Sequence, residues 1–100
     1  MAEKRPAYVI AEVEVTDEAG FRDYVAAATP TLAPYNARLI VRSKADSKEG
    51  TIPRGDVVVV AFDSLDDAQR WYASAAYSKT IPLRQRSANS PLFIVEGEPL

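Results

Sequence analysis

The side chains able to do chemistry in this 100-residue sequence are mainly tyrosines, arginines and glutamates, because it contains no histidine and no cysteine. Without cysteine there is no thiolate nucleophile, no disulfide and no Cys-based zinc site. Without histidine, the commonest metal ligand and the commonest general base at neutral pH are both missing. We therefore expect no metal site and no cofactor, and the usual histidine-dependent kinds of catalysis are excluded.

Five side chains stand out as candidates for handling protons or holding an anion. Tyr24, Tyr77 and Glu12 carry oxygens that can take or give a proton, and Arg42 and Arg84 carry guanidinium groups. A guanidinium binds a carboxylate or phosphate through two parallel hydrogen bonds. Structural roles stay open for the same residues: a core aromatic for Tyr24, and an ion pair with Asp or Glu for each arginine.

Two further aromatic residues are adjacent, and adjacency restricts where they point. Trp71 and Tyr72 cannot face the same way, so we expect one in the core and the other lining a cleft or interface. Tyr77 and Arg84 are seven residues apart, which places them on one face of a helix. The candidates for lining a ligand pocket are therefore Glu12, Tyr24, Arg42, Trp71, Tyr72, Tyr77 and Arg84.

Period-two patterns predict the strands that must position these side chains. Residues 7–15 have apolar side chains at every odd position, and residues 37–43 alternate in the same way. Residues 56–62 contain four consecutive valines, which is typical of a strand buried on both faces. Residues 92–96 form a short apolar strand, and the polar stretch between the second and third strands is predicted as a loop.

Helical spacing predicts two helical regions between these strands. The first follows a cap at Thr16 or Asp17 and is interrupted at Pro30. The second begins after Ser64, whose hydroxyl and the acids that follow it resemble a capping box, and continues as a second segment interrupted at Pro82. Three sets of residues are spaced so that each set lies on one helical face. They are Phe21, Tyr24, Val25, Ala28 and Leu32; Leu65, Ala68, Trp71, Tyr72 and Ala75; and Tyr77, Ile81, Arg84 and Ala88.

The order of these elements is βαββαβ, which predicts an α+β fold of the ferredoxin-like type. Two right-handed crossovers give a four-stranded antiparallel sheet with both helices on one face. The length fits one domain, which we expect over residues 7–97, with an N-terminal tail at 1–6 and a C-terminal tail at 98–100.

The predicted sheet leaves one face without a covering layer. On the first strand that face would carry Tyr8, Ile10, Glu12 and Glu14, and the central third strand is apolar on both sides. Soluble monomers rarely tolerate a large contiguous apolar patch, and the same face of a second copy can cover it. The sequence therefore predicts a homodimer through the open sheet face, that is, a dimeric α/β barrel.

Four charged residues accompany that apolar face if the strands alternate regularly. Glu12, Glu14, Arg38 and Arg42 would share it. They could lie solvated at the strand ends and the rim, since charges are seldom fully buried. They could also line a polar cavity inside the dimer, where each buried charge would need a partner.

Charge and hydropathy limit the partners of the chain. A net charge of −2 argues against nucleic acid, whose binders normally show a basic surplus or stripe. The N-terminus is polar and the longest apolar run, residues 57–62, is far too short to span a bilayer. We expect a cytoplasmic protein that binds neither nucleic acid nor membrane.

The run from Trp71 to Tyr77 ahead of Arg84 is the most specific of several recognisable segments, the others being residues 8–11, 39–42, 49–50, 57–65 and 94–97. Together these segments resemble the domain-of-unknown-function 1330 family of the dimeric α/β-barrel superfamily. The resemblance implies a ferredoxin-like homodimer with a pocket between sheet and helices. It implies no settled activity. Related branches include antibiotic-biosynthesis-type monooxygenases and muconolactone-isomerase-like proteins, which adds a small aromatic compound to the ligands to consider.

Three functions follow as expectations. The first is a homodimeric protein that binds a small organic ligand, aromatic or anionic, without catalysis. The second is a cofactor-independent monooxygenase or isomerase acting on a small aromatic compound, with Tyr24, Tyr77 or Glu12 handling protons. The third is a dimeric interaction module without a ligand. A polar pocket would favour the first two, and a dry, filled interior would favour the third.

Overall fold

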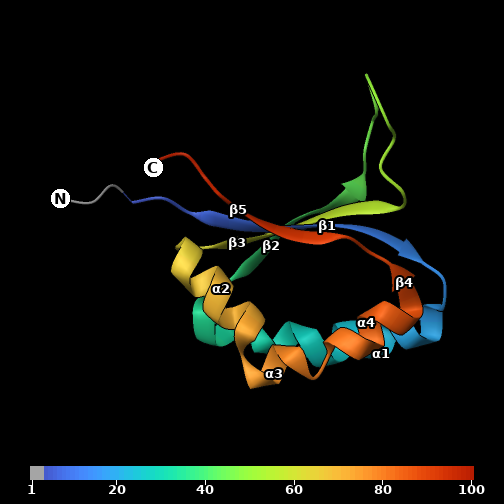
Figure 1. The fold of residues 1–100 in the computed structure, drawn as a ribbon, viewed down its shortest axis with the longest axis horizontal. Helices are drawn as coiled ribbons and strands as arrows, with labels where there is room; N and C mark the ends of the chain where they lie inside the picture. Colours follow the sequence, from blue (N-terminus) through green and yellow to red (C-terminus); the bar gives the residue numbers. More distant parts are fainter. Residues whose placement is uncertain (1–3) are drawn as a thin grey trace.

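The computed structural model describes residues 4–100 and has two layers, an antiparallel sheet and a set of helices on one of its faces (Figure 1). The strands are β1 (Ala7–Val15), β2 (Arg38–Lys44), β3 (Asp56–Phe62), β4 (Ala88–Asn89) and β5 (Leu92–Glu96). The helices are α1 (Glu18–Ala28), α2 (Leu65–Ala73), α3 (Ala75–Ser78) and α4 (Ile81–Ser87), with short 3₁₀ helices η1 (Thr29–Thr31) and η2 (Ala33–Tyr35).

The sheet is ferredoxin-like, as the sequence predicts, but its last strand is divided. β1 pairs with β3 on one side and with β4 and β5 on the other, and β2 pairs with the far side of β3. β4 and β5 share one register on β1, with Val15 opposite Ala88 and Ala11 opposite Leu92. They are therefore two halves of one edge strand, broken at Ser90 and Pro91.

A bulge in β2 corrects one prediction about the faces of the sheet. Leu39 lies opposite Val60 and Val41 opposite Val59, so the extra residue between them shifts the alternation by one. Arg42 consequently lies opposite Val58, on the side that faces the helices. The sequence predicts that Arg38 and Arg42 both lie on the face of the sheet away from the helices. This prediction is wrong for Arg42, because the bulge interrupts the regular alternation of side chains.

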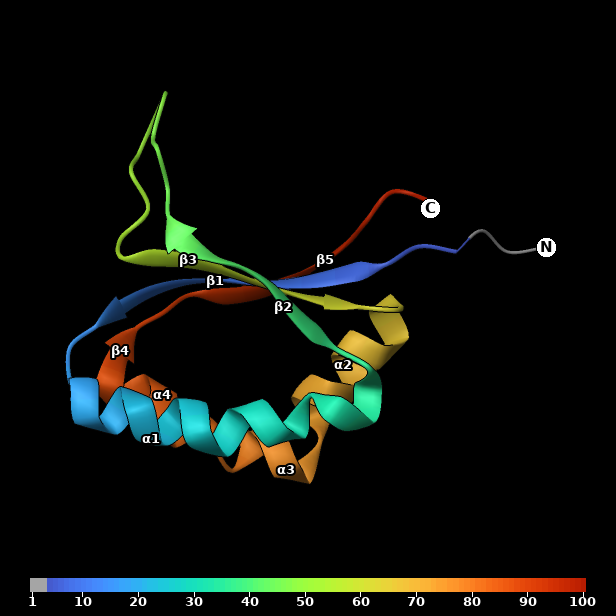
Figure 2. The same cartoon turned by 180° about the vertical axis from the view of Figure 1, so that it is seen from behind.

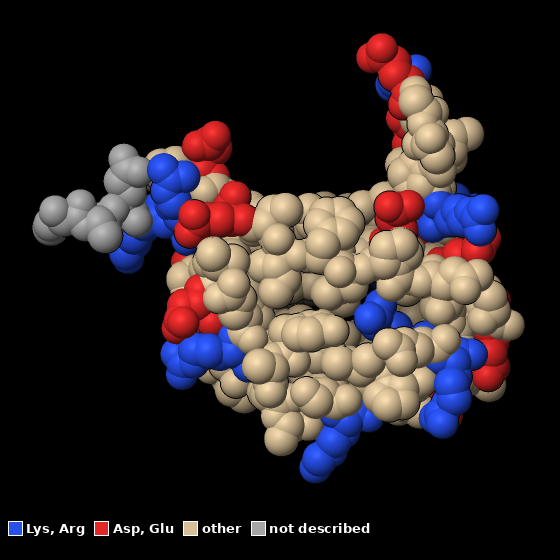
Figure 3. Space-filling model, viewed as in Figure 1, with Lys and Arg blue, Asp and Glu red and all other residues tan. Residues whose placement is uncertain are grey.

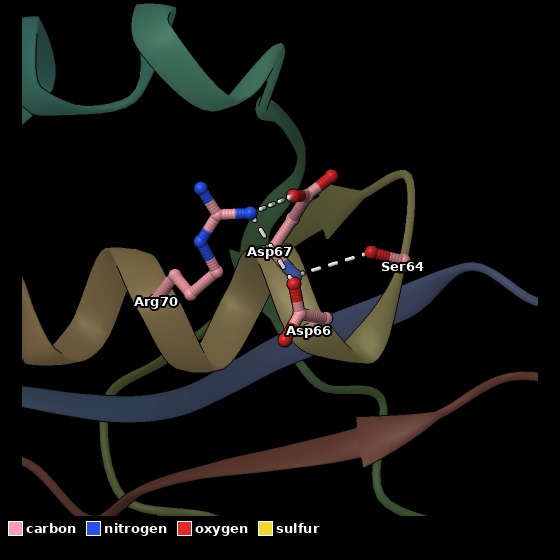
Figure 4. A network of polar contacts seen from close by, with 4 residues as sticks. All are labelled: Ser64, Asp66, Asp67 and Arg70. Carbon is pink, nitrogen blue, oxygen red and sulfur yellow. Dashed lines mark hydrogen bonds and ion pairs between the residues drawn. The ribbon is translucent and has the colours of Figure 1, made fainter.

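The first turn of α2 confirms the predicted cap. The Ser64 hydroxyl accepts a hydrogen bond from the backbone N–H of Asp67 at 3.1 Å (Figure 4). Arg70, one turn further on, lies 3.3 Å from Asp66 and 3.9 Å from Asp67. The acids therefore sit where the helix dipole favours them, and they do not form part of the cavity described below.

The second helical region is three short helices, not two segments broken at Pro82. Ser74 has an extended backbone, with ψ at 149°, so it ends α2 and caps α3 by accepting from the N–H of Tyr77. Pro82 lies in the first turn of α4, where its missing N–H costs no hydrogen bond. Tyr77 and Arg84 therefore occupy different helices, and Ala88 begins a strand.

The core between the two layers is centred on aromatic residues. Trp71 is 3% exposed, its ring centroid is 4.0 Å from that of Tyr77, and its indole N–H donates to the Thr31 hydroxyl at 2.9 Å. Phe62 at the end of β3 packs against Trp71 with a centroid distance of 5.4 Å. This cluster packs against the end of the sheet nearest α2. The helices α1 and α4, which pack against each other, lie at the other end.

The loop between β2 and β3 rises from the sheet on the side away from the helices (Figures 1 and 2). Its return into β3 requires a glycine: Gly55 has φ of +68°, and a Cβ there would collide with the backbone carbonyl of Val13. Among residues 4–100, no helix has the length and apolar character that a bilayer crossing requires.

Candidate functional site

A cavity of about 170 Å³ lies between the helix-facing side of the sheet and the helices. Its walls are mostly apolar side chains of β1, β3 and α1, with Leu32, Trp71 and Leu92. Five residues with polar side chains interrupt this lining: Tyr24, Thr29, Arg42, Arg84 and Ser90. Figure 3 shows a basic side chain recessed among uncharged residues between the two layers. Among the described residues of the lining, two are cationic and none is acidic.

Arg84 is a buried guanidinium without a carboxylate partner. It projects from α4, is 7% exposed, and donates from Nη1 to the backbone carbonyl of Ser90 at 2.6 Å. Its Nε is shielded from solvent and makes no hydrogen bond. Within residues 4–100 no Asp or Glu lies in ion-pair range of it, although burial of an unpaired charge is costly.

Ser90 lies beside this guanidinium, at the break between β4 and β5. Its Oγ is buried and has no hydrogen-bond partner. The break arises because Pro91 has no N–H to donate to a strand ladder, while its carbonyl still accepts from the N–H of Glu12 at 3.1 Å. The strand interruption therefore turns an edge-strand residue into part of the cavity wall.

Tyr24 and Tyr77 form a hydroxyl pair at the helix side of the cavity. Their oxygens are 2.9 Å apart, Tyr24 lines the cavity, and Tyr77 is fully buried. Burial raises the pKa of Tyr24 far above its ordinary value, the neighbouring Tyr77 raises it further, and the charge of Arg84 opposes both. Tyr24 is therefore a neutral phenol at physiological pH, suited to hydrogen bonding and not to acting as a base.

Arg42 reaches the cavity from β2 because of the bulge. Its side chain is exposed overall, and within the part of the chain that the structure describes it forms no ion pair. It lies on the same side of the sheet as Leu39 and Val58, which also line the cavity. Arg42 thus adds a second positive charge at the rim of the cavity. Regular alternation predicts it on the other face of the sheet.

Three of the seven candidates stand apart from the cavity lining. Glu12 points to the opposite face of the sheet, beside Ile52 and Arg54 of the loop, because it alternates with the inward-facing Ala11. Tyr72 is 37% exposed and its ring lies 5.7 Å from that of Tyr77. Tyr77 lies behind the cavity wall, where it contacts two lining residues, Tyr24 and Trp71. The structure brings together Tyr24, Arg42, Trp71 and Arg84.

Sequence reasoning missed Ser90 and the role of Thr31. Ser90 carries one available signal, since a serine followed by proline just before a terminal strand marks a break in the ladder. The Thr31 hydroxyl accepts a hydrogen bond from the indole N–H of Trp71 and donates one to the backbone carbonyl of Ala28. No local sequence pattern could predict the first of these, because Trp71 is 40 residues away. Within residues 4–100 there is no cluster of three or more Asp or Glu residues that could hold a metal ion.

Among residues 4–100, no layer of helices covers the opposite side of the sheet (Figure 1). Tyr8 lies opposite Val95 and Ile10 opposite Phe93, and on the other flank Ile10 lies opposite Val59. Phe93 and Val95 of the edge strand β5 are 45% and 39% exposed, both large values for apolar side chains. We call this surface, formed by Tyr8, Ile10, Val59, Phe93 and Val95, the open face.

Solved structures with the same architecture come from several bacteria. A protein of unknown function from Rhodopseudomonas palustris superposes with a TM-score of 0.76 at 13% identity, covering 97% of this chain and 84% of that one. SnoaB, a cofactor-independent oxygenase from Streptomyces nogalater, gives 0.57 at 12% identity, covering 99% and 97%. A dimeric protein of unknown function with a ferredoxin-like fold from Bacteroides fragilis gives 0.59 at 10% identity, covering 91% and 95%. At these identities the likeness establishes the fold.

One family model matches most of the chain. It is described as a domain of unknown function (DUF1330) and covers residues 6–98. No curated protein matches the chain. The match includes every strand and helix and all the cavity-lining residues.

Proposed function

The chain belongs to the domain-of-unknown-function 1330 family, and we propose that it is a homodimeric protein that binds a small organic ligand in the cavity between its sheet and its helices. One observation carries the proposal: an apolar cavity into which a buried, carboxylate-free arginine is built. A core that served stability alone would be filled, and it would not hold such a group.

The size and lining of the cavity match a small ring compound. A cavity of about 150 Å³ lined by Leu, Ile and Phe is large enough to bind benzene, and the present one measures about 170 Å³. Its apolar walls would supply most of the binding free energy, and its few polar groups would fix orientation. The ligand is therefore a compound of about one aromatic ring.

The dimer part of the proposal rests on the open face. Its apolar residues form a contiguous patch across β3, β1 and β5, which a second copy would remove from water. The ferredoxin-like protein from Bacteroides fragilis is dimeric, which supports this arrangement for a sheet of the same topology.

A cofactor-independent oxygenase is the second candidate, and the fold shared with SnoaB supports it. Such an enzyme would need a group that removes a proton from its substrate. The cavity offers arginines, hydroxyls and a tyrosine of raised pKa, and its lining contains no carboxylate. This set favours binding over proton abstraction. A pure interaction module fits less well, because it calls for a filled interior.

A cavity-filling substitution tests the proposal. Val25 is half-buried and lines the cavity, whereas its neighbour Ala26 is exposed on the same helix. We expect benzamide, a neutral one-ring probe, to bind the wild type and Ala26→Trp with millimolar affinity in NMR titrations. Val25→Trp should lose this binding at least about tenfold, because the indole occupies the space. Equal binding of benzamide by both tryptophan variants, or binding of neither benzamide nor benzoate by the wild type, would overturn the proposal.

A further inference from the structure

We infer that the ligand is a monocarboxylate with an apolar ring or chain, and that Arg84 and Ser90 bind its carboxylate at the broken end of the last strand. This inference rests on the proposed function and specifies the chemistry of its ligand. Two atoms carry it, Arg84 Nε and Ser90 Oγ. They are the only buried side-chain polar atoms of residues 4–100 that lack a hydrogen-bond partner.

The guanidinium of Arg84 is held in place with one edge unused. Nη1 is bonded to the Ser90 carbonyl at 2.6 Å, so the side chain is anchored without any contribution from a ligand. Within residues 4–100, neither Nε nor Nη2, which form its other edge, has a hydrogen-bond partner. That edge is the geometry in which arginine binds both oxygens of one carboxylate through parallel hydrogen bonds.

Ser90 adds a donor next to the same group. Its backbone carbonyl positions Arg84, and its side chain belongs to the same cavity wall. A serine hydroxyl can rotate to donate a hydrogen bond to a carboxylate oxygen. Arg84 of α4 and Ser90 of the strand break, both in the cavity lining, thus lie in contact with each other, and each carries one buried polar atom without a partner.

The charges around the cavity favour a ligand that carries a negative charge. Arg84 and Arg42 are both cationic, neither is paired with a carboxylate of the described residues, and the lining has no acid. Tyr24 is neutral, because burial raises its pKa, so it donates or accepts without adding negative charge. A cationic ligand would meet two positive charges, and a neutral one would leave Arg84 without a counter-charge.

The rest of the lining selects the body of the ligand. Beyond the arginine end, the walls consist of residues such as Val9, Val60, Leu32 and Trp71, which offer no polar side-chain atoms apart from the indole N–H already bonded to Thr31. A phosphate or a dicarboxylate would place a second charged group against these residues at a high desolvation cost. One carboxylate on an apolar body is the chemistry that fits both ends.

The test compares benzoate with benzamide, which has nearly the same shape and no charge, by isothermal titration calorimetry at neutral pH. We expect benzoate to bind the wild type at least about tenfold more tightly, because charge-assisted hydrogen bonds are about twice as strong as neutral ones. Ser90→Ala keeps the backbone carbonyl that anchors Arg84, so it should fold normally and weaken benzoate several-fold with little effect on benzamide.

Arg84→Met should abolish the preference for benzoate and leave benzamide binding in place. Arg86→Met, an exposed position two residues along α4, and Ser47→Ala, in the exposed loop, are the matched controls and should keep the preference. If Arg84→Met fails to fold, Ser90→Ala and the comparison of the two probes still decide. Equal affinity of the wild type for both probes would overturn the inference that the ligand is a carboxylate. It would leave the proposed binding cavity unaffected. Binding of neither probe would overturn both.

Discussion

The two faces of the sheet are built from the same strands and differ in what covers them. The helix-facing side is closed by aromatic packing around Trp71 at one end and holds a cavity with Arg84 at the other. The open face carries Ile10, Phe93 and Val95 with no layer over them. Under the proposed function, alternation along one strand would serve two binding tasks, a small ligand on one side of the sheet and a second copy of the chain on the other.

The largest effect is expected where the helix-facing side is most tightly packed. Trp71→Ala removes a 3%-exposed indole and its hydrogen bond to Thr31, so we expect the free energy of unfolding in urea to fall by about 3–5 kcal/mol. Tyr72→Ala, next to it and 37% exposed, should cost much less. Similar losses for the two variants would mean that the layer is not anchored at Trp71.

A charge on the open face is expected to break the proposed dimer and leave the fold of the monomer intact. Val59 lies opposite Ile10 in the middle of that face. Val59→Lys should raise the dimer dissociation constant at least about 100-fold in sedimentation equilibrium, since an uncompensated charge buried at an interface costs about 3–5 kcal/mol.

The matched control for this charge is Ser78→Lys on the exposed side of α3. It should leave the dissociation constant unchanged, and circular dichroism should report a native fold for both variants. A wild-type protein that is monomeric at micromolar concentration, or a Val59→Lys protein that dimerises normally, would refute the role assigned to the open face.

The hydroxyl pair on the helix-facing side offers a smaller and pH-dependent test. Tyr24→Phe leaves the buried Tyr77 hydroxyl without its partner, so the free energy of unfolding should fall by about 1–2 kcal/mol at neutral pH. Chemical denaturation of the two proteins measures this difference.

The sign of the pH dependence follows from the raised pKa of Tyr24. The folded state holds the phenol proton more tightly than the unfolded chain, in which the pKa is near 10.0. The stability contributed by this group is complete below pH 10 and is lost as pH rises above it. Wild type should therefore lose stability between pH 10 and 11 more steeply than Tyr24→Phe; parallel curves would contradict the burial of this phenol.

The strands β1, β3 and β5 were predictable because each has a local pattern, whereas β4 was not, since Ala88 fits a helical spacing. Residues 7–15, 56–62 and 92–96 have the bounds that the sequence predicts, since alternation and valine runs are properties of the strand itself. The cap at Ser64 is equally local. The bulge in β2 was not predictable, because an extra residue is defined only by the strand it pairs with, and Arg42 changes face as a result.

The cavity was predictable only in part for the same reason. Residue type alone marks arginines and tyrosines as candidates for binding or chemistry, so Tyr24, Arg42 and Arg84 could be named from the sequence. Glu12 was named for its chemistry, and the alternation that already predicted it on the uncovered face of the sheet keeps it out of the cavity. Ser90 gains its place from a strand break and from Arg84, neither of which is visible in a pattern of neighbouring residues.

The most direct test of the ligand-binding claim is a ¹⁵N–¹H NMR titration of the labelled protein with benzoate. We predict saturable shifts at Tyr24, Arg84 and Ser90, including the side-chain Nε–H of Arg84, and no change at Ile10 or Val59 on the open face. Shifts confined to the open face, or a linear response without saturation at the cavity residues, would contradict the account.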